Sequence, residues 1–164
     1  MKKVSFADMH CSVAQALEVI GEWWTLLILR DAFFGVTRFE EFQSRLAIAR
    51  NILTARLDNL VDAGVLERCP YDEARSRYDY VLTDMGRALW PVLTTIRQWG
   101  DDWVVEPGQE PVRMVHTGCG AHARAELACE HCGEWLTLAE VRAVPGPGLE
   151  EPAMLRGSVR SRRS

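Results

Sequence analysis

The sequence lacks the segments that would place the chain in a membrane or outside the cell. Its longest strongly apolar run, WWTLLIL, is far shorter than the roughly 20 residues that cross a bilayer as a helix. The opening residues MKKVSFADMH carry two lysines, but no apolar stretch of the kind found in signal peptides follows them. We therefore expect a cytoplasmic protein with no membrane partner.

Signatures of catalysis are also missing. There is no nucleophile elbow, no phosphate-binding glycine loop and no paired histidine and acid motif for proton transfer. Positive charge is not in excess, because 23 acidic residues outnumber 19 Lys and Arg and give a formal net charge of -4. We therefore expect a protein that is not an enzyme, in which any binding of nucleic acid comes from a local basic patch.

Internal repeats are not visible, and the five cysteines do not suggest a disulfide framework. In a reducing compartment, cysteines are more often thiols or metal ligands than disulfides. A chain of 164 residues, nearly half of them apolar, can bury one good core and carry a small appendage.

The stretch SRLAIARNILTARLDNLVDAGVLER, residues 44–68, has the pattern of an amphipathic helix with a basic outer face. Its apolar residues follow the spacing of one helical face: Ile48, Leu53, Leu57, Leu60 and Val61. The opposite face offers Arg50, Asn51, Thr54 and Arg56, with no acidic residue before Asp58. This face suits a polyanion, although an ordinary solvated surface is the alternative for the helix alone.

The neighbouring segments complete a helix-turn-helix and a wing. Helical patterns are expected over residues 11–20, 22–34 and 37–47, the last ending just before the basic helix. After Gly64, the run VLERCPYDEARSRYDYVLT predicts a β-hairpin. We expect Arg75 and Arg77 near its tip to reach DNA phosphates or a minor groove, with a plain polar loop as the alternative.

A long helix is expected after the hairpin, over residues 86–104. Its apolar positions are Leu89, Val92, Leu93, Ile96, Trp99 and Trp103. A stripe of this size needs a cover, and a second subunit contacting Ile96, Trp99 and Trp103 is the simplest one. Packing on the chain's own first helix is the alternative.

Several motifs resemble the HxlR-type winged helix-turn-helix regulators of bacteria. They are Cys11 with SVAQALEVIGEWWTLLILRDAFFG, then RFEEFQSRL, ILTARLDNLVDAGVLER, RYDYVLTDMGRAL and WGDDW. The resemblance implies a homodimer in which residues 50–56 form the helix that enters the major groove, RSRYDY forms the wing, and the first and last helices form the dimer interface. Ala49 stands where members often have a capping serine or threonine.

The expected fold class is therefore mainly α (α+β), a winged helix-turn-helix domain with a long C-terminal dimerisation helix and a small cysteine-containing tail module. We expect an N-terminal arm over residues 1–10, the DNA-binding and dimerisation domain over 11–104 and a linker over 105–115. The small Cys/His module follows over 116–144, and a disordered tail over 145–164.

The tail module contains a pair of cysteines, CEHC, whose thiolates can face one zinc ion. The expected ligands are Cys119, His122, Cys129 and Cys132, with His116 as the alternative histidine. Free thiols in a short hairpin are an equally weighted interpretation, and a thioredoxin-like redox motif is a weaker one because no strand is predicted ahead of Cys129.

Cys11 is a candidate sensor of an oxidant or electrophile. It falls at the start of the first expected helix, where unpaired amides and the helix dipole stabilise a thiolate. The resemblance adds to this, since some members of the family are thiol-based sensors. The competing interpretation is a small buried residue at a subunit contact.

Together these features predict a sequence-specific regulator of transcription that binds double-stranded DNA as a homodimer on a palindromic operator. A thiol-reactive or small-molecule effector is the expected signal, whereas the sequence leaves the operator and the sign of regulation open. A protein-interaction or redox module that uses the helical domain as scaffold is the alternative. It predicts no positive stripe along Arg50, Arg56, Arg75 and Arg77.

Overall fold

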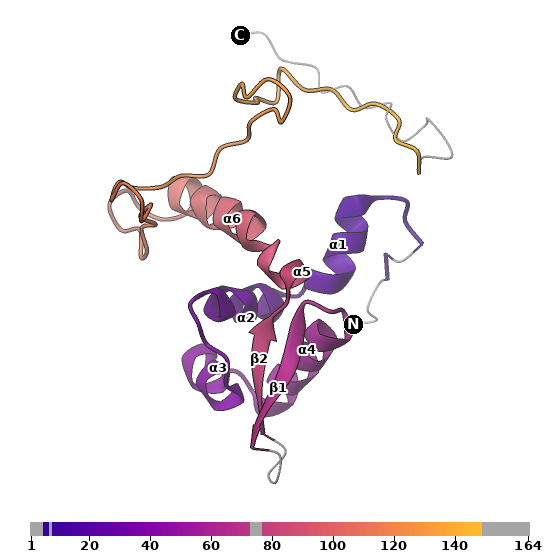
Figure 1. Cartoon of the computed structure of the whole chain (residues 1–164), viewed down its shortest axis with the longest axis vertical. Coiled ribbons are helices and arrows are strands. Elements are labelled where there is room, and N and C mark those ends of the chain that lie inside the picture. Colours follow the sequence, from indigo (N-terminus) through magenta and orange to yellow (C-terminus); the bar gives the residue numbers. More distant parts are fainter. Residues whose placement is uncertain (1–4, 7, 73–76, 149–164) are drawn as a thin grey trace. The chain divides into compact units, whose positions relative to one another are not determined.

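The computed structural model describes residues 5–6, 8–72 and 77–148, and it divides the chain into two units, Met1–Pro107 and Gly108–Ser164. All described helices and strands belong to the first unit (Figure 1). They are α1 (Ser12–Ile20), α2 (Trp23–Phe33), α3 (Phe39–Leu46), α4 (Arg50–Asp62), β1 (Leu66–Asp72), β2 (Arg77–Leu82), α5 (Asp84–Arg87) and α6 (Trp90–Trp103). The predicted winged helix-turn-helix fold is thus confirmed.

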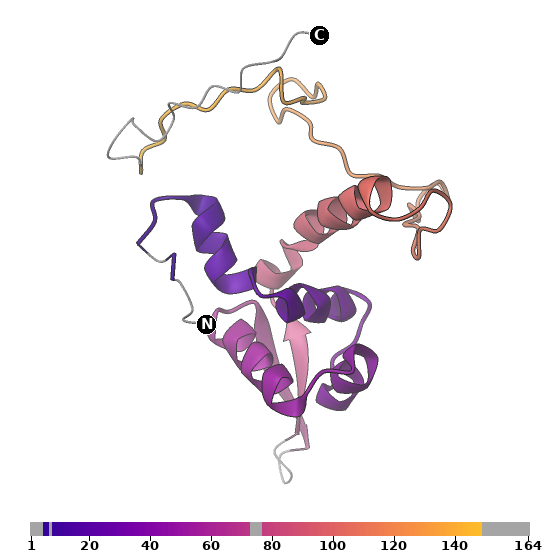
Figure 2. The same cartoon turned by 180° about the vertical axis from the view of Figure 1, so that it is seen from behind.

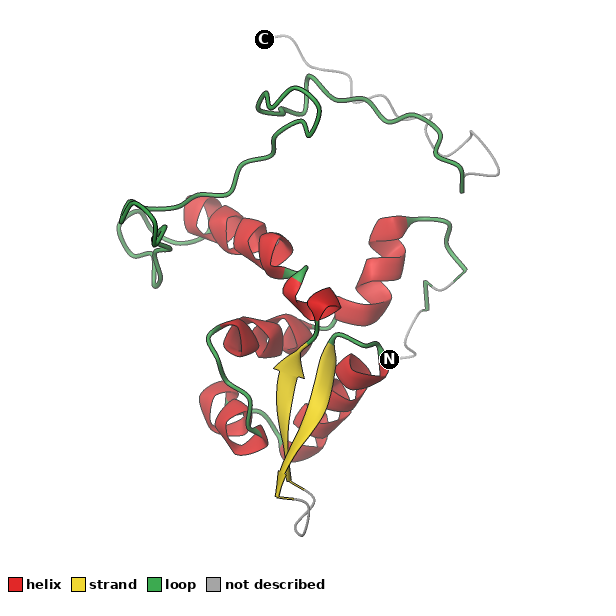
Figure 3. Ribbon diagram, viewed as in Figure 1, coloured by secondary structure: helices red, strands yellow, loops and turns green. Residues whose placement is uncertain are grey.

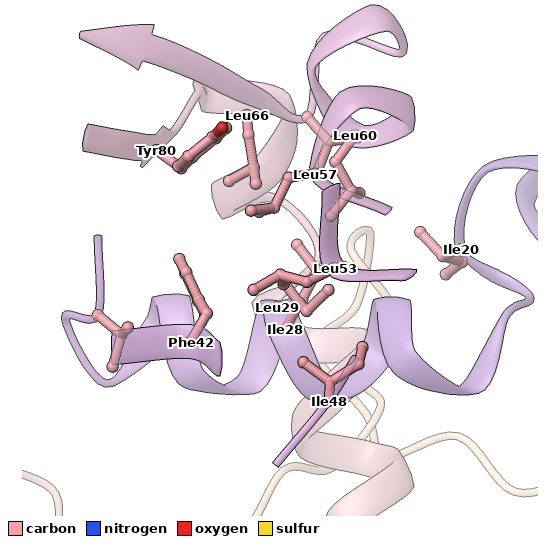
Figure 4. Close-up of a cluster of buried hydrophobic side chains, with 12 residues drawn as sticks. Ile20, Ile28, Leu29, Phe42, Ile48, Leu53, Leu57, Leu60, Leu66 and Tyr80 are labelled. Carbon is pink, nitrogen blue, oxygen red and sulfur yellow. The ribbon is translucent and has the colours of Figure 1, made fainter. Parts of the chain in front are cut away.

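The core lies between α2, α4 and the hairpin. Leu53, Leu57 and Leu60, on the predicted apolar face of α4, are almost fully buried, and Figure 4 shows them near Ile28 and Leu29 of α2. Burial of each such side chain contributes about 1.5–3 kcal/mol, so this cluster fixes α4 with its opposite face outward.

The end of α4 sets the direction of the hairpin. Gly64 has a φ of +74°, a conformation that glycine adopts without steric cost. The backbone N–H of Val65 then donates to the Leu60 carbonyl at 2.9 Å, and the chain enters β1 at once.

The wing is an antiparallel pair of strands (Figure 3). In its register Leu66 faces Leu82 and Arg68 faces Tyr80. A short third segment lies beside β2, because Tyr80 N–H donates to the Thr37 carbonyl at 2.8 Å. The Thr37 hydroxyl also donates to the Asp79 carboxylate at 2.9 Å. The loop between α2 and α3 is therefore fastened to the wing.

The predicted single helix over 86–104 is wrong, because the structure breaks it into α5 and α6 at residues 88–89. Pro91 causes the break: it has no N–H to donate, and its ring would collide with the carbonyl four residues earlier, that of Arg87. Arg87 is the last residue of α5, and Pro91 occupies the first turn of α6. Thr83 caps α5 by accepting from Gly86 N–H at 3.1 Å.

Helices α1 and α6 extend from the core on the side opposite the free end of the hairpin, as Figures 1 and 2 both show. Each carries apolar side chains that the rest of the unit leaves exposed. On α6 the exposed fractions are 46% for Ile96, 60% for Trp99 and 78% for Trp103. On α1, Val13 and Leu17 are exposed.

The described part of the second unit, residues 108–148, contains two isolated β-bridges and no helix or longer strand. No single described helix is long and apolar enough to cross a membrane. Helices α1 and α2 reach that length and composition only as a pair bent by 77°.

Candidate nucleic-acid interface

The turn between α3 and α4 brings the start of α4 to the surface. Ala47 adopts a left-handed conformation with a φ of 50°, which reverses the chain, and buried Ile48 anchors the turn. Ala49 is the residue before α4 and supplies no side-chain cap, as its side chain predicts. No side chain therefore caps the first backbone N–H groups of α4. They lie at the N-terminus of the helix, the end that attracts negative charge.

Arg50 and Thr54 lie on the edge of α4 that faces the wing. Both line a surface hollow with Phe39 of α3 and with Arg77 and Tyr78 of β2. Glu40, Tyr71 and Tyr80 also line this hollow. The Arg50 guanidinium lies 4.8 Å from the centre of the Phe39 ring, a cation–π contact that holds the arginine at the rim. Thr54 donates its hydroxyl hydrogen to the Arg50 carbonyl at 2.9 Å, which leaves the oxygen free to accept.

Arg56 lies on the other edge of α4. Its guanidinium forms an ion pair with Glu22 Oε2 at 3.1 Å, and only 21% of its side chain is exposed. Sequence reasoning grouped Arg56 with Arg50 as an unneutralised cation, but Glu22, just before α2, comes close only in the folded chain. Exposed Asn51 and Ala55 lie between the two edges and line a second hollow with Arg56 and Trp23.

The wing contributes one described cation from the predicted pair. Arg77 is exposed at the start of β2, opposite Asp72. Arg75 lies outside the described residues. Arg38, which the sequence did not single out, stacks 4.8 Å from the centre of the Tyr71 ring and pairs with Asp79 at 3.7 Å. Its partners are non-local, so no local pattern marks it.

Cys11 is the residue before α1 and is half-buried. All five cysteines are free thiols in this structure. The prediction that Cys11 lies at the start of the first helix is confirmed. Its role as a sensor stays a prediction.

The four predicted metal ligands of the tail do not lie together. Among the described residues, no three histidine, cysteine or acidic side chains are close enough to share a metal ion. His116 Nδ1 lies 3.3 Å from Cys119 Sγ, whereas the backbone of His122 forms an isolated β-bridge with Val115. Hydrogen bonds from the backbone N–H of Cys132 and then of His131 lower the pKa of the Cys129 thiol.

Comparisons with known proteins agree with this geometry. The family model of HxlR-like helix-turn-helix proteins matches residues 19–107. The uncharacterized HTH-type transcriptional regulator Rv3095 of Mycobacterium tuberculosis is 45% identical over 139 residues, which cover 85% of this chain and 88% of Rv3095.

Two solved structures are also similar to this chain. PA1607, described as a candidate transcription factor, is 44% identical with a TM-score of 0.78, over 87% of this chain and all of that one. The redox regulator HypR in its reduced form is 30% identical with a TM-score of 0.53, over 56% of this chain and 92% of HypR. These relatives are regulators and not enzymes. The chain belongs to the HxlR-like helix-turn-helix family of DNA-binding transcriptional regulators.

Proposed function

We propose that the chain works as a homodimer that recognises a two-fold symmetric operator and responds to a thiol-reactive signal. In each subunit, α4 enters the major groove and the wing lies along the phosphate backbone. One observation carries this proposal: Arg50 and Thr54 of α4 line the same hollow as Arg77 of the wing, so the two elements offer one continuous face.

Base recognition is assigned to the exposed centre of α4. Asn51 carries an amide that can pair with adenine through two hydrogen bonds, and Ala55 is small enough to admit a base edge. Thr54 offers its hydroxyl oxygen beside them. Asn51→Ala and Thr54→Ala are expected to relax sequence preference more than they weaken binding to unrelated DNA.

In a two-fold symmetric dimer, the two copies of α4 must enter the major groove on the same face of the duplex, one helical turn apart. The selected operator should therefore be palindromic, with half-sites about 10 base pairs apart from centre to centre. Selection of bound fragments from genomic DNA, followed by footprinting, tests this directly. A single asymmetric site protected by one subunit would overturn the dimeric arrangement and leave DNA binding itself in place.

The wing is tested by the salt dependence of operator affinity. Arg77→Ala is expected to weaken binding to all sequences and to reduce the slope of log K against log salt by about one, because one phosphate contact is lost. The double variant Arg75→Ala with Arg77→Ala should reduce it by up to about two. Arg113→Ala, the same change of charge in the second unit, should leave the slope unaltered. If the double variant kept the salt slope of the wild type, the proposed contact between the wing and DNA phosphates would be excluded.

Cys11 is proposed as the sensing thiol. It lies at the start of α1, the helix whose exposed Val13 and Leu17 we assign to the subunit contact, so a modification there changes how two subunits meet. The redox regulator HypR, which is similar to this chain over 56% of its length, has been solved in a reduced and an oxidised form.

The test compares Cys11→Ser with its parent, both carrying serine at the tail cysteines 119, 129 and 132. Operator affinity is measured before and after peroxide, diamide or an aldehyde. The parent should lose affinity and the Cys11→Ser variant should not. An identical response from both proteins would leave Cys11 as a packing residue.

A further inference from the structure

The second unit contains two loops with the same pattern of backbone hydrogen bonds, each with a glycine of positive φ in its turn. In the first, His116 N–H donates to the Ala121 carbonyl at 2.9 Å, and Gly120 N–H donates to the His116 carbonyl at 2.8 Å. In the second, Cys129 N–H donates to the Glu134 carbonyl and Gly133 N–H to the Cys129 carbonyl, both at 2.8 Å. We call these loops knuckle 1 (residues 115–122) and knuckle 2 (residues 128–135).

The correspondence extends along the whole of both loops at an offset of 13 residues. The β-bridges join Val115 to His122 and Ala128 to Trp135. Outside them, Ala123 N–H donates to the Met114 carbonyl at 2.9 Å, and Leu136 N–H to the Leu127 carbonyl at 2.8 Å. The φ values of Gly120 and Gly133 are +72° and +76°. The tail therefore contains a structural repeat, although the sequence shows none.

The offset places metal-binding side chains at equivalent points of the two knuckles. His116 corresponds to Cys129, and Cys119 to Cys132, so each knuckle has one donor before its turn and one within it. His122 corresponds to Trp135, a bridge position outside the turn.

Knuckle 1 already holds its donors at a separation suited to zinc. His116 Nδ1 and Cys119 Sγ are 3.3 Å apart. Two ligands of a tetrahedral zinc ion, with bonds of about 2.05 Å to nitrogen and 2.3 Å to sulfur, lie about 3.6 Å apart. The imidazole rests against the backbone of Gly118, where a Cβ would come within 3.0 Å of the ring, so the glycine makes room for it.

We propose that knuckles 1 and 2 close on one zinc ion bound by His116, Cys119, Cys129 and Cys132. Three cysteines and one histidine are an established ligand set for structural zinc. Among the described residues each knuckle supplies two ligands and no third lies near, so zinc joins the knuckles only when they meet. The nine residues between Cys119 and Cys129 are long enough for this, since a chain of that length spans up to about 30 Å.

Zinc would also supply the stability that the segment lacks. The described side chains of residues 108–148 are nearly all exposed, so burial of apolar surface contributes little to holding the knuckles together. In small domains of this kind, the free energy of metal binding takes the place of a hydrophobic core. Zinc binding also displaces thiol protons, including the one that Cys132 donates to Glu134 Oε2 across 3.8 Å.

The experiment uses the full chain with a tag free of histidine, purified without chelator and dialysed against a small excess of zinc. Elemental analysis should give about one zinc ion per chain. His116→Ala, Cys119→Ser, Cys129→Ser and Cys132→Ser should each lower the affinity for zinc at least about tenfold. Cobalt substituted for zinc should give the visible absorption of a tetrahedral site with thiolate charge-transfer bands, and these should vanish in the same four variants.

His122→Ala and Cys69→Ser are the matched controls, one histidine and one cysteine outside the proposed set, and both should bind zinc as the wild type does. Circular dichroism at the helix bands checks that every variant is folded, because the described helices all lie in the first unit. Zinc well below one per chain in the dialysed wild type overturns the proposal. So does a site that survives His116→Ala and is lost in His122→Ala.

Discussion

Arg50 and Arg56 carry the same charge on the same helix, yet the fold gives them different neighbours. Arg50 stacks on Phe39 beside the wing, whereas Arg56 pairs with Glu22 at 3.1 Å. A cation that is neutralised by a carboxylate and mostly buried releases few DNA counterions when DNA binds. We therefore assign Arg50 to DNA contact and Arg56 to the attachment of α4 to the start of α2.

This difference predicts opposite behaviour for two alanine substitutions. Arg50→Ala should weaken operator binding and lower the salt slope by about one. Arg56→Ala should leave the slope unchanged and lower the free energy of unfolding instead, measured by urea denaturation. Glu22→Gln, which frees Arg56 and removes a negative charge, should strengthen DNA binding. Equal slope changes in the two alanine variants would contradict the assignment.

At the scale of the element, α5 is held by a close approach of two backbones. Gly86 lies so near the hairpin that an added Cβ would come within 2.2 Å of the Val65 carbonyl oxygen and 3.0 Å of Leu82 Cδ2. The same substitution in α6, at Gly100, meets nothing within 4 Å. The two glycines therefore form a matched pair for testing how tightly the segment after β2 is attached to the wing.

Gly86→Ala is expected to destabilise the protein by about 1–3 kcal/mol, because the backbone must shift to admit the methyl group. Gly100→Ala should stabilise it by about 0.5–1 kcal/mol, the gain in helix propensity from glycine to alanine. Thermal and urea unfolding of both variants measure the two effects. A neutral Gly86→Ala would show that α5 is not docked against the turn that follows α4.

Local patterns in the sequence predicted the elements well, because apolar spacing reports which face of a helix is buried. The apolar face of α4, its end at Gly64 and the hairpin all follow from residues within a few positions of one another. The break at residues 88–89 was missed because the prediction placed Pro91 near the first turn of one long helix. In a helix that begins before Arg87, Pro91 is an interior residue whose ring collides with the Arg87 carbonyl, so it reaches a first turn only because a new helix begins at Trp90.

Contacts between distant residues account for the rest of what was missed. Nothing near Arg56 in the sequence reveals that Glu22 will neutralise it. The two knuckles share only Cys119 with Cys132 and Gly120 with Gly133 at the 13-residue offset, too little for a repeat to be visible. A search for histidine in place of the first cysteine of a pair, with glycine after the second ligand, would have found knuckle 1.

For the whole molecule, the exposed stripe of α6 is the surface that leads us to propose a dimer. Val92, Ile96, Trp99 and Trp103 follow one another at intervals of four, three and four residues and so lie along one side of the helix. We propose that this stripe, with α1, packs against the same surface of a second subunit. Apolar area of this extent is rarely left open on a soluble monomer.

Ile96→Asp places a charge in the middle of the stripe and should convert the dimer into monomers, measured by sedimentation or light scattering. Operator affinity should fall with it, because each half-site then binds a separate subunit. Val144→Asp, a matched change at an exposed apolar residue of the second unit, should remain dimeric. A dimer that persists with Asp at position 96 would place the subunit contact elsewhere.

Because of the break before α6, the backbone at residues 88–89 sets the direction in which that helix points. With 14 residues at about 1.5 Å each, α6 is about 21 Å long. A tilt of about 10° at residues 88–89 therefore moves the far end of α6 by about 4 Å. In a dimer joined along α6, the angle between α6 and the rest of the first unit thus sets the distance between the wings of the two subunits. Substitutions at Ala88 or Leu89 should therefore retune the preferred half-site spacing while every DNA-facing side chain stays the same.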